Sequence, residues 1–393
     1  MLSIAYIIVF GFLGNSLFNW FKLPGLLGMI LAGILIGPFG LDLLDEPLMI
    51  ISSDLRTIAL IIILLRAGLG LHRTTLKKIG KRAALLSVIP GILEGTSIIF
   101  MAMIFLNMSF VEAGMLGFIL AAVSPAVIVP SMLLLMKRHI GVKKHIPALV
   151  LSAASIDDVI AITIFSSFLS VYVSANINIA YQVISIPISI LLGILLGIGI
   201  GFLLMLLFKK YHMRDSQKIT LLIAVSILMV GFSNLVSDQI HIAALLGVMT
   251  IGIVITEMKN TLGTRLAIKF EKVWVLAEVF LFVLVGAAVD VEAGLSIGVI
   301  GLVIIIGGLL MRTVGVFIAL IGKTYLLKEK LFIAIAYTPK ATVQAAIGAL
   351  PLSVGVASGN TILALAVLSI LATAPLGAIG ISKTAKSLLK EAS

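Results

Sequence analysis

The chain has no cysteine among its 393 residues, and only 11% of its residues are charged. The absence of cysteine excludes disulfide bonds, thiolate metal sites and thiol redox chemistry. An average soluble domain is about 25% charged, whereas 61% of this chain is hydrophobic. The five histidines show no metal-ligand spacing. We therefore expect an all-α polytopic membrane protein without a resident cofactor.

Hydropathy and turn residues predict about thirteen membrane spans. They cover residues 2–21, 25–41, 55–71, 83–106, 112–136, 146–173, 180–208, 218–236, 241–256, 270–289, 295–322, 329–353 and 361–381. The N-terminus has no basic region and no small-residue cleavage site, so the first span is expected to be a membrane helix and not a cleaved signal. The 36 glycines fit close helix packing in lipid.

Lysine and arginine residues are concentrated in alternate loops. The loops after odd-numbered spans are basic, as in residues 73–82, 137–144 and 209–218, and the other loops are acidic or neutral. Arg56, expected in an external loop, is the exception. This alternation predicts an external N-terminus and a cytoplasmic C-terminus. It explains the net charge of +11 by topology and contact with membrane lipids, so no nucleic-acid partner is expected.

Several charged residues lie inside the predicted spans, where a charge costs at least about 2.5–3.5 kcal/mol on insertion scales. The adjacent Asp157 and Asp158 lie in the middle of the span 146–173. The other intramembrane charges are Arg66, Glu94, Glu278, Arg312 and Lys340. Such residues mark functional sites by default. We interpret the aspartate pair as a cation-binding, proton-exchanging site.

Two spans contain prolines that predict a broken helix. Ser124-Pro125 and Pro130 lie inside the fifth span, and Pro339-Lys340 lies inside the twelfth. Proline removes a backbone donor and clashes with the preceding turn. Unwound backbone at membrane depth is tolerated where it lines a cavity or is buried in protein. We therefore expect both breaks to line a site.

The breaks and the charges are predicted to lie at one depth. At about 1.5 Å per helical residue, Asp157, Arg312, Lys340 and the Ser124 break all fall near the middle of a hydrocarbon core about 30 Å thick. Broken helices and charges at the midplane are typical of secondary transporters. Spans 4–6 and spans 11–13 each have a broken middle span, and these two run in opposite directions. This arrangement predicts inverted repeats.

Several motifs together resemble a known family. They are Pro24 to Gly33 followed by Gly37-Pro38, Arg66 to Leu71, Ser124 to Val127, Asp157-Asp158, and Pro339 to Ala346. The set is similar to the cation:proton antiporter superfamily and, within it, to the bacterial-type short form of the NHA-type sodium/proton exchangers. The resemblance covers nearly the whole chain. It implies exchange of Na⁺ or Li⁺ for H⁺ and the NhaA-like antiporter fold, with two crossing discontinuous helices.

The resemblance also implies a homodimer that works by an elevator mechanism. A core ion-transport domain of residues 83–173 and 295–393 would move past a dimerisation domain of residues 1–82 and 218–294. Residues 174–217 would form a linker helix between them. The protein would belong in the plasma membrane of a bacterium or an archaeon.

The resemblance implies that Asp158 binds the cation and the proton in turn, while Asp157 pairs with Arg312. Na⁺ and Li⁺ are hard ions that prefer oxygen ligands. The candidate ligands are Asp158, Asp157, Ser155, Ser124, Thr342 and Gln344. An arginine stays protonated in proteins, so a fixed Arg312–Asp157 pair leaves one titrating carboxyl group. We therefore expect exchange of one proton per cation, with little voltage dependence.

The roles of the remaining intramembrane charges are open at this stage. Arg312 could instead snorkel to the cytoplasmic face. Lys340 could neutralise the negative end of the half-helix before the break formed by Pro339. Glu94 could pair with Arg312 or Lys340, act as a second acid or make a packing hydrogen bond. Glu278 and Arg66 are expected to be solvated or structurally paired.

Other function classes fit the pattern less well. An intramembrane aspartyl protease needs two facing carboxyl groups, whereas neighbouring residues on one helix point about 100° apart, so we expect no enzyme. A channel needs a continuous lining of carbonyl groups or charges. A K⁺/H⁺ antiporter and a Na⁺-coupled solute symporter remain as alternatives.

Overall fold

The computed structural model describes residues 1–21, 23–70, 80–173, 179–236, 242–322 and 325–389, and every regular element in these ranges is helical. The helices are α1 (Leu2–Trp20), α2 (Gly25–Ile36), α3 (Glu46–Ile50), α4 (Ser52–Gly70), α6 (Gly80–Phe105), α7 (Phe110–Ala121), α8 (Pro125–Lys137), η1 (Val142–Lys144), α9 (Ile146–Val173), α10 (Ile179–Lys210), α11 (Asp215–Leu235), α12 (Ala244–Met258), α13 (Asn260–Ala287), α14 (Val291–Ala319), α15 (Leu327–Ala336), α16 (Thr342–Ile347), α17 (Leu350–Ser353) and α18 (Gly359–Leu388).

Seven of the described helices are long and apolar enough to cross a membrane: α1, α6, α9, α10, α11, α14 and α18. Shorter apolar helical segments are α2, α7, α12 and residues 342–353. Large apolar side chains such as Leu203 (64% exposed), Leu228 (71%) and Leu310 (63%) project outward from the long helices. So much exposed apolar surface is solvated by lipid and not by water, as expected for a multi-pass membrane protein.

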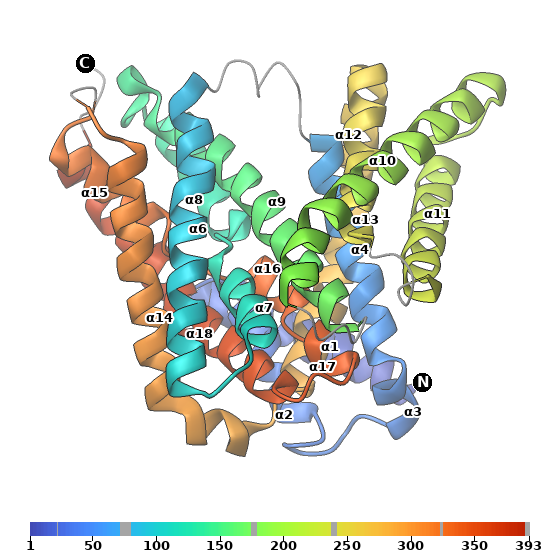
Figure 1. Cartoon of the computed structure of the whole chain (residues 1–393), viewed down its shortest axis with the longest axis horizontal. Helices are drawn as coiled ribbons and strands as arrows, with labels where there is room; N and C mark the ends of the chain where they lie inside the picture. Colours follow the sequence, from blue (N-terminus) through green and yellow to red (C-terminus); the bar gives the residue numbers. More distant parts are fainter. Residues whose placement is uncertain (22, 71–79, 174–178, 237–241, 323–324, 390–393) are drawn as a thin grey trace. The chain divides into compact units, whose positions relative to one another are not determined.

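Internal contacts divide the chain into two compact units. Unit 1 comprises residues 1–48, 79–161 and 282–393, and unit 2 comprises residues 49–78 and 162–281. In unit 1, α6 packs along α14 and α7, while α18 contacts α14, α15 and the segments α16 and α17 (Figure 1). In unit 2, α12 packs against α4 and α10. The predicted division into core and dimerisation domains is a functional one and stays a prediction.

In unit 1, two of the predicted spans are interrupted beside a proline. α7 ends at Ala121 and α8 begins at Pro125, because proline is tolerated in the first turn of a helix, where its missing N–H has no intrahelical partner. α15 ends at Ala336 and α16 begins at Thr342, with Pro339 between them. The interruptions lie beside Pro125 and Pro339; that they belong to two discontinuous membrane helices stays a prediction.

Two local sequence predictions are wrong. Arg56 lies inside α4 and is only 6% exposed, instead of lying in an external loop. The helix starts earlier than hydropathy suggests because Ser52 and Ser53 belong to its polar first turn, where short polar residues are favoured.

The second wrong prediction is the start of the tenth span, since α13 begins at Asn260 and not near residue 270. Leu262, Leu266 and Phe270 are buried at a spacing of four residues. They form an apolar stripe that holds this polar first part of the helix in place.

The end of α13 packs on α2 at backbone distance. A methyl group added at Gly33 would collide with the carbonyl oxygen of Val283, and one added at Gly286 would collide with the carbonyl oxygen of Ile30. Small residues allow such close approach of helices in lipid. The two glycines therefore fix the distance between α2 and the last turns of α13.

We predict that Gly33→Ala destabilises the protein by about 1–3 kcal/mol, because overpacking forces the two helices apart. The thermal unfolding midpoint in detergent would fall accordingly. The matched control is Gly199→Ala in α10, where a Cβ atom would meet nothing within 4 Å. The control should leave the midpoint unchanged or raise it, since alanine is the better helix former. Equal behaviour of the two variants would contradict the packing argument.

Candidate functional site

The site lies inside unit 1, where side chains from α6, α9 and α14 meet the two helix interruptions. Asp157 of α9 is 2% exposed. Its Oδ2 atom accepts a hydrogen bond of 3.0 Å from the backbone N–H of Val123, which lies in the α7–α8 interruption. A Cβ atom at Gly91 of α6 would lie 2.9 Å from Asp157 Oδ1. The carboxylate is therefore held between α6 and the first interruption.

Arg312 of α14 is the largest fully buried side chain among the described residues, with 1% exposure. Its Nε donates to Glu94 Oε2 of α6, and its Nη2 donates to the carbonyl oxygen of Ala121, the last residue of α7. The same Nη2 lies 3.5 Å from Asp157 Oδ2, so the expected ion pair with Asp157 is present. Arg312 thus joins two carboxylates and a helix end, and it does not snorkel to the surface.

Lys340, in the α15–α16 interruption, is also 1% exposed. Its Nζ lies 2.8 Å from Glu94 Oε2, the same oxygen that accepts from Arg312. Its backbone N–H donates to Thr373 Oγ1 of α18 over 2.8 Å. Of the roles left open for Glu94, the structure shows an ion pair with both buried cations at once.

The two interruptions are hydrogen-bonded to each other. The N–H of Ser124 donates to the carbonyl oxygen of Pro339 over 2.8 Å, and the N–H of Thr342 lies 3.5 Å from Ser124 Oγ. Gln344 Nε2 donates to the carbonyl oxygens of Ile119 (2.9 Å) and Ala122 (2.8 Å). A helix that ends inside a membrane protein leaves carbonyl groups without partners. Gln344 satisfies two of them at the end of α7.

Several buried oxygen atoms in this region have no hydrogen-bond partner among the described residues. They include Asp158 Oδ1, Gln344 Oε1 and the hydroxyl oxygen of Tyr337. Buried polar atoms are normally satisfied, and exceptions often mark an unseen water or ion. The site therefore offers carboxylate, amide and hydroxyl oxygens to a hard cation.

The structure brings most of the predicted site residues together. Asp157, Arg312, Glu94, Lys340, Ser124 and Gln344 are linked by the contacts given above, and Asp158 and Thr342 adjoin them in sequence or by contact. The side chains of Ser155, Pro125 and Pro130 lie outside the described part of the structure. Arg66 and Glu278 belong to unit 2, where Arg66 Nη2 lies 3.4 Å from Glu271 Oε1.

Sequence reasoning missed Tyr337 and Thr373. Tyr337 is fully buried, and its ring centroid lies 5.7 Å from Arg312 Cζ. It directly precedes the Thr338-Pro339-Lys340 stretch, so an aromatic hydroxyl group beside a predicted break was the available signal. Thr373 gave no signal, because a single threonine in an apolar helix usually hydrogen-bonds within its own helix.

Comparison with known proteins finds relatives that are similar in sequence and solved structures that are similar in fold. The family described as sodium/hydrogen exchanger, transmembrane, matches residues 4–386. Human sodium/hydrogen exchanger 9B2 is 34% identical over 395 residues, which cover 94% of this chain and 70% of the relative. Human sodium/hydrogen exchanger 9B1 is 34% identical over 377 residues, covering 91% and 71%.

Among solved structures, the sodium proton antiporter MjNhaP1 from Methanocaldococcus jannaschii at pH 8 matches with a TM-score of 0.80 and 21% identity. The match covers 98% of this chain and 96% of that chain. At this identity the likeness concerns the fold.

We predict that substitutions of Glu94 and Lys340 have non-additive effects on the stability of the protein. Breaking a buried ion pair from one side costs about 3–5 kcal/mol, because the other charge stays buried without compensation. Glu94→Gln and Lys340→Gln should therefore each lower the thermal unfolding midpoint. The double variant should lose clearly less than the sum of the two losses.

The control for this cycle is Glu271→Gln, which removes an exposed pair with Arg66 (side chains 64% and 36% exposed). An exposed pair contributes about 0–1 kcal/mol, so the control should barely move the midpoint. Strict additivity of the two buried substitutions would show that Glu94 and Lys340 do not act as a pair.

Proposed function

Because this chain belongs to the sodium/hydrogen exchanger family, we propose that it exchanges Na⁺ or Li⁺ for H⁺, one for one. Cation/proton antiport by a multi-pass membrane protein follows from the family. The proposal adds which cation is exchanged, how many protons are exchanged for it, and which residues bind both. The observation that carries it is the charge balance of the buried cluster.

The cluster contains three carboxyl groups, on Glu94, Asp157 and Asp158, and two cationic groups, on Arg312 and Lys340. Glu94 and Asp157 have cationic partners, whereas Asp158 Oδ1 has no partner among the described residues. With all five groups ionised, the cluster carries one net negative charge. Burying a net charge is costly, so one proton or one monovalent cation at Asp158 restores neutrality. Because either one suffices, the two ions compete for the same carboxylate.

Competition of this kind is the chemical basis of exchange. A protonated Asp158 has lost the charge that binds a cation, and a cation-bound Asp158 has lost the charge that binds a proton. The cation would be held by oxygens of Asp158 and Asp157, with Ser124, Thr342, Gln344 and Ser155 as further candidates. An all-oxygen site suits Na⁺ and Li⁺, which are hard ions.

The stoichiometry follows from the two cationic groups. Arg312 stays protonated throughout, and its contacts to Glu94, Asp157 and Ala121 hold it in one place. Lys340 is paired with Glu94. If neither group releases its proton, Asp158 is the only group that changes occupancy. One positive charge then moves in each direction, and transport is electroneutral.

Movement of the site would follow the elevator scheme. We propose that α7–α8 and α15–α16 are two crossing discontinuous helices of inverted repeats, within a fold of about thirteen spans. The hydrogen bonds between the interruptions and the Glu94–Arg312–Asp157 contacts favour a core that moves as one body. Residues 83–173 and 295–393 would form this core, residues 1–82 and 218–294 a dimerisation domain, and residues 174–217 the linker helix.

The remaining proposals concern the setting of the protein. The chain would form a homodimer in the plasma membrane of a bacterium or an archaeon, in contact with membrane lipids. Its N-terminus would lie outside and its C-terminus in the cytoplasm, as the alternation of basic loops indicates. We propose no enzymatic reaction, no resident cofactor and no nucleic-acid partner.

We predict that Asp158→Asn abolishes exchange in proteoliposomes. In the test, a pH gradient is imposed, Na⁺, Li⁺ or K⁺ is added, and internal pH is followed with and without a clamped membrane potential. Wild type should dissipate the gradient with Na⁺ or Li⁺ at the same rate under both conditions. Asp158→Asn should be inactive yet fold normally, because the two remaining carboxylates and the two cationic side chains of the cluster balance in charge. Glu271→Gln serves as the active control.

The other outcomes separate the alternatives. Dissipation by K⁺ alone would make the protein a K⁺/H⁺ antiporter. A rate that depends on membrane potential would show that a second group exchanges charge, and electroneutrality would be wrong. Proton movement by no cation, in protein that still binds Na⁺, would favour a Na⁺-coupled solute symporter.

A further inference from the structure

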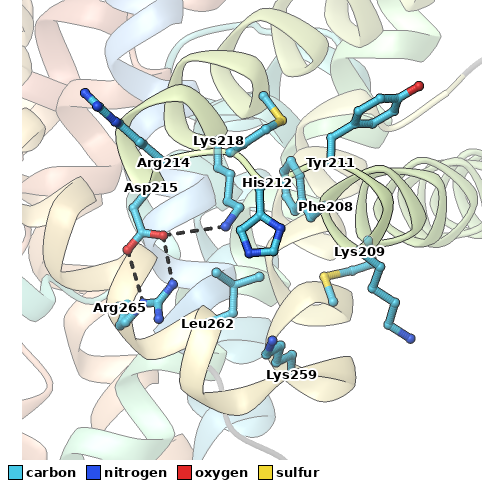
Figure 2. Close-up of a pocket in the computed structure, with 12 residues that line it drawn as sticks. Phe208, Lys209, Tyr211, His212, Arg214, Asp215, Lys218, Lys259, Leu262 and Arg265 are labelled. Carbon is cyan, nitrogen blue, oxygen red and sulfur yellow. Dashed lines mark hydrogen bonds and ion pairs between the residues drawn. The ribbon is translucent and has the colours of Figure 1, made fainter.

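A cavity of about 430 Å³ lies in unit 2, at residues that the exchange reaction does not use. It forms where α10 ends, where α11 begins and where α12 passes into α13 (Figure 2). Its lining therefore comes from two stretches of the chain, residues 205–218 at the α10–α11 junction and residues 259–265 at the start of α13. The basic loop 209–218 contributes to it, so the cavity is on the predicted cytoplasmic side.

The lining of this cavity is strongly basic. It includes Lys209, Arg214, Lys218, Lys259 and Arg265, against the single carboxylate of Asp215. With His212 neutral, these groups carry a net charge of +4 (five positive charges minus one negative). Such a concentration of one sign in a concave site raises the local concentration of anions.

The single carboxylate of the lining, Asp215, is already paired with basic side chains of the protein. Arg265 binds it through two hydrogen bonds, Nε to Oδ2 at 3.1 Å and Nη2 to Oδ1 at 2.9 Å. Lys218 Nζ lies 3.7 Å from the same Oδ1. Lys209, Arg214 and Lys259 have no ion-pair partner within the part of the chain that the structure describes. Their charges are therefore available to a ligand.

Some of the residues that line the cavity are buried and form its base. Lys218 is 9% exposed, Leu262 4% and Met205 1%. The Nζ atom of Lys218 lies 5.7 Å from the ring centroid of Phe208, which fixes the lysine against α10. Figure 2 shows the imidazole of His212 in the middle of the lining, with Asp215 and its two basic partners on one side. The imidazole provides a further N–H donor.

We propose that this cavity, the basic pocket, binds an anion that bears a phosphate group. A phosphate group carries about −1.5 to −2 charges and three strong acceptor oxygens, and lysine binds it as a point charge. Three cations without an ion-pair partner in the described part of the chain, Lys209, Arg214 and Lys259, line the pocket together with the imidazole of His212. The proposal goes beyond the exchange reaction and does not depend on it.

Two sources of the phosphate group share this chemistry. The apolar part of α10 leads directly into the pocket, and Leu203, Leu206 and Leu207 on it are 64%, 45% and 36% exposed. Acyl chains of a phospholipid could lie along these side chains while the headgroup enters the pocket. A soluble phosphate compound in the cytoplasm could enter from the water side.

Either ligand would contact the end of α10, the start of α11 and the junction of α12 and α13 at once, and so hold them together. A ligand that binds only the folded protein stabilises it by RT ln(1 + [L]/Kd), so the unfolding midpoint rises once the ligand concentration exceeds Kd. Thermal unfolding of the full-length protein is therefore a direct readout of the pocket, independent of transport.

The experiment compares two double variants of equal charge. Lys209→Gln with Lys259→Gln removes two unpaired cations of the pocket and keeps the Asp215–Arg265 contact. The control, Lys383→Gln with Lys386→Gln, removes two exposed lysines from the last turns of α18. In one arm, Tris pyrophosphate is titrated into detergent-purified protein at constant ionic strength. In the other, the protein is reconstituted in nanodiscs of phosphatidylcholine, with or without phosphatidic acid at about one lipid in five.

We expect the unfolding midpoint of wild type and of the control to rise with ligand concentration as RT ln(1 + [L]/Kd). The pocket variant should need at least tenfold more pyrophosphate, or lose most of the rise given by phosphatidic acid. A response in the nanodisc arm alone assigns the lipid as ligand, and a response in the pyrophosphate arm assigns a soluble phosphate. Equal losses in both double variants, or no rise of the wild-type midpoint in either arm, would overturn the proposal.

Discussion

The structure of unit 1 depends on one constraint: a buried cluster of charges must stay close to neutral. Arg312 cannot lose its proton, and it contacts two carboxylates and the end of α7. Lys340 adds a second cation to the same carboxylate oxygen of Glu94. These contacts offset the cost of burying Glu94, Asp157 and the two cations, whereas Oδ1 of the third carboxyl group, Asp158, has no hydrogen-bond partner among the described residues. This imbalance is the reason for proposing Asp158 as the residue that exchanges the proton and the cation.

The helix interruptions make this cluster possible. A continuous α-helix has no free N–H or carbonyl group in its middle, so it could not offer the Val123 N–H to Asp157 or the Ala121 carbonyl to Arg312. The interruptions also bind each other through Ser124 and Pro339. The buried charged side chains therefore hydrogen-bond to the free backbone groups of the interruptions. Each provides the other with polar partners that lipid cannot provide.

Much of this could be predicted from the sequence, because in a membrane every deviation from an apolar helix is informative. Intramembrane charges pointed to Asp157, Arg312 and Lys340, and prolines inside predicted spans pointed to the positions of the two interruptions. Three-dimensional contacts were harder to predict. The pairing of Glu94 with both cations could only be left open. Tyr337 was overlooked although it stands beside a predicted break, and Thr373 was missed because a single threonine in an apolar helix gives no signal. Arg56 and the start of α13 were misplaced because hydropathy marks the apolar part of a helix and not its polar first turns.

The most direct test of the charge balance is a count of protons. Choline-balanced NaCl is added to purified protein in weakly buffered detergent, and the protons released are measured over a series of starting pH values. The account predicts a release that rises toward one proton per protomer as the starting pH is lowered, and that does not exceed one. Release of two protons, or saturable Na⁺ binding without proton release at any pH, would contradict it.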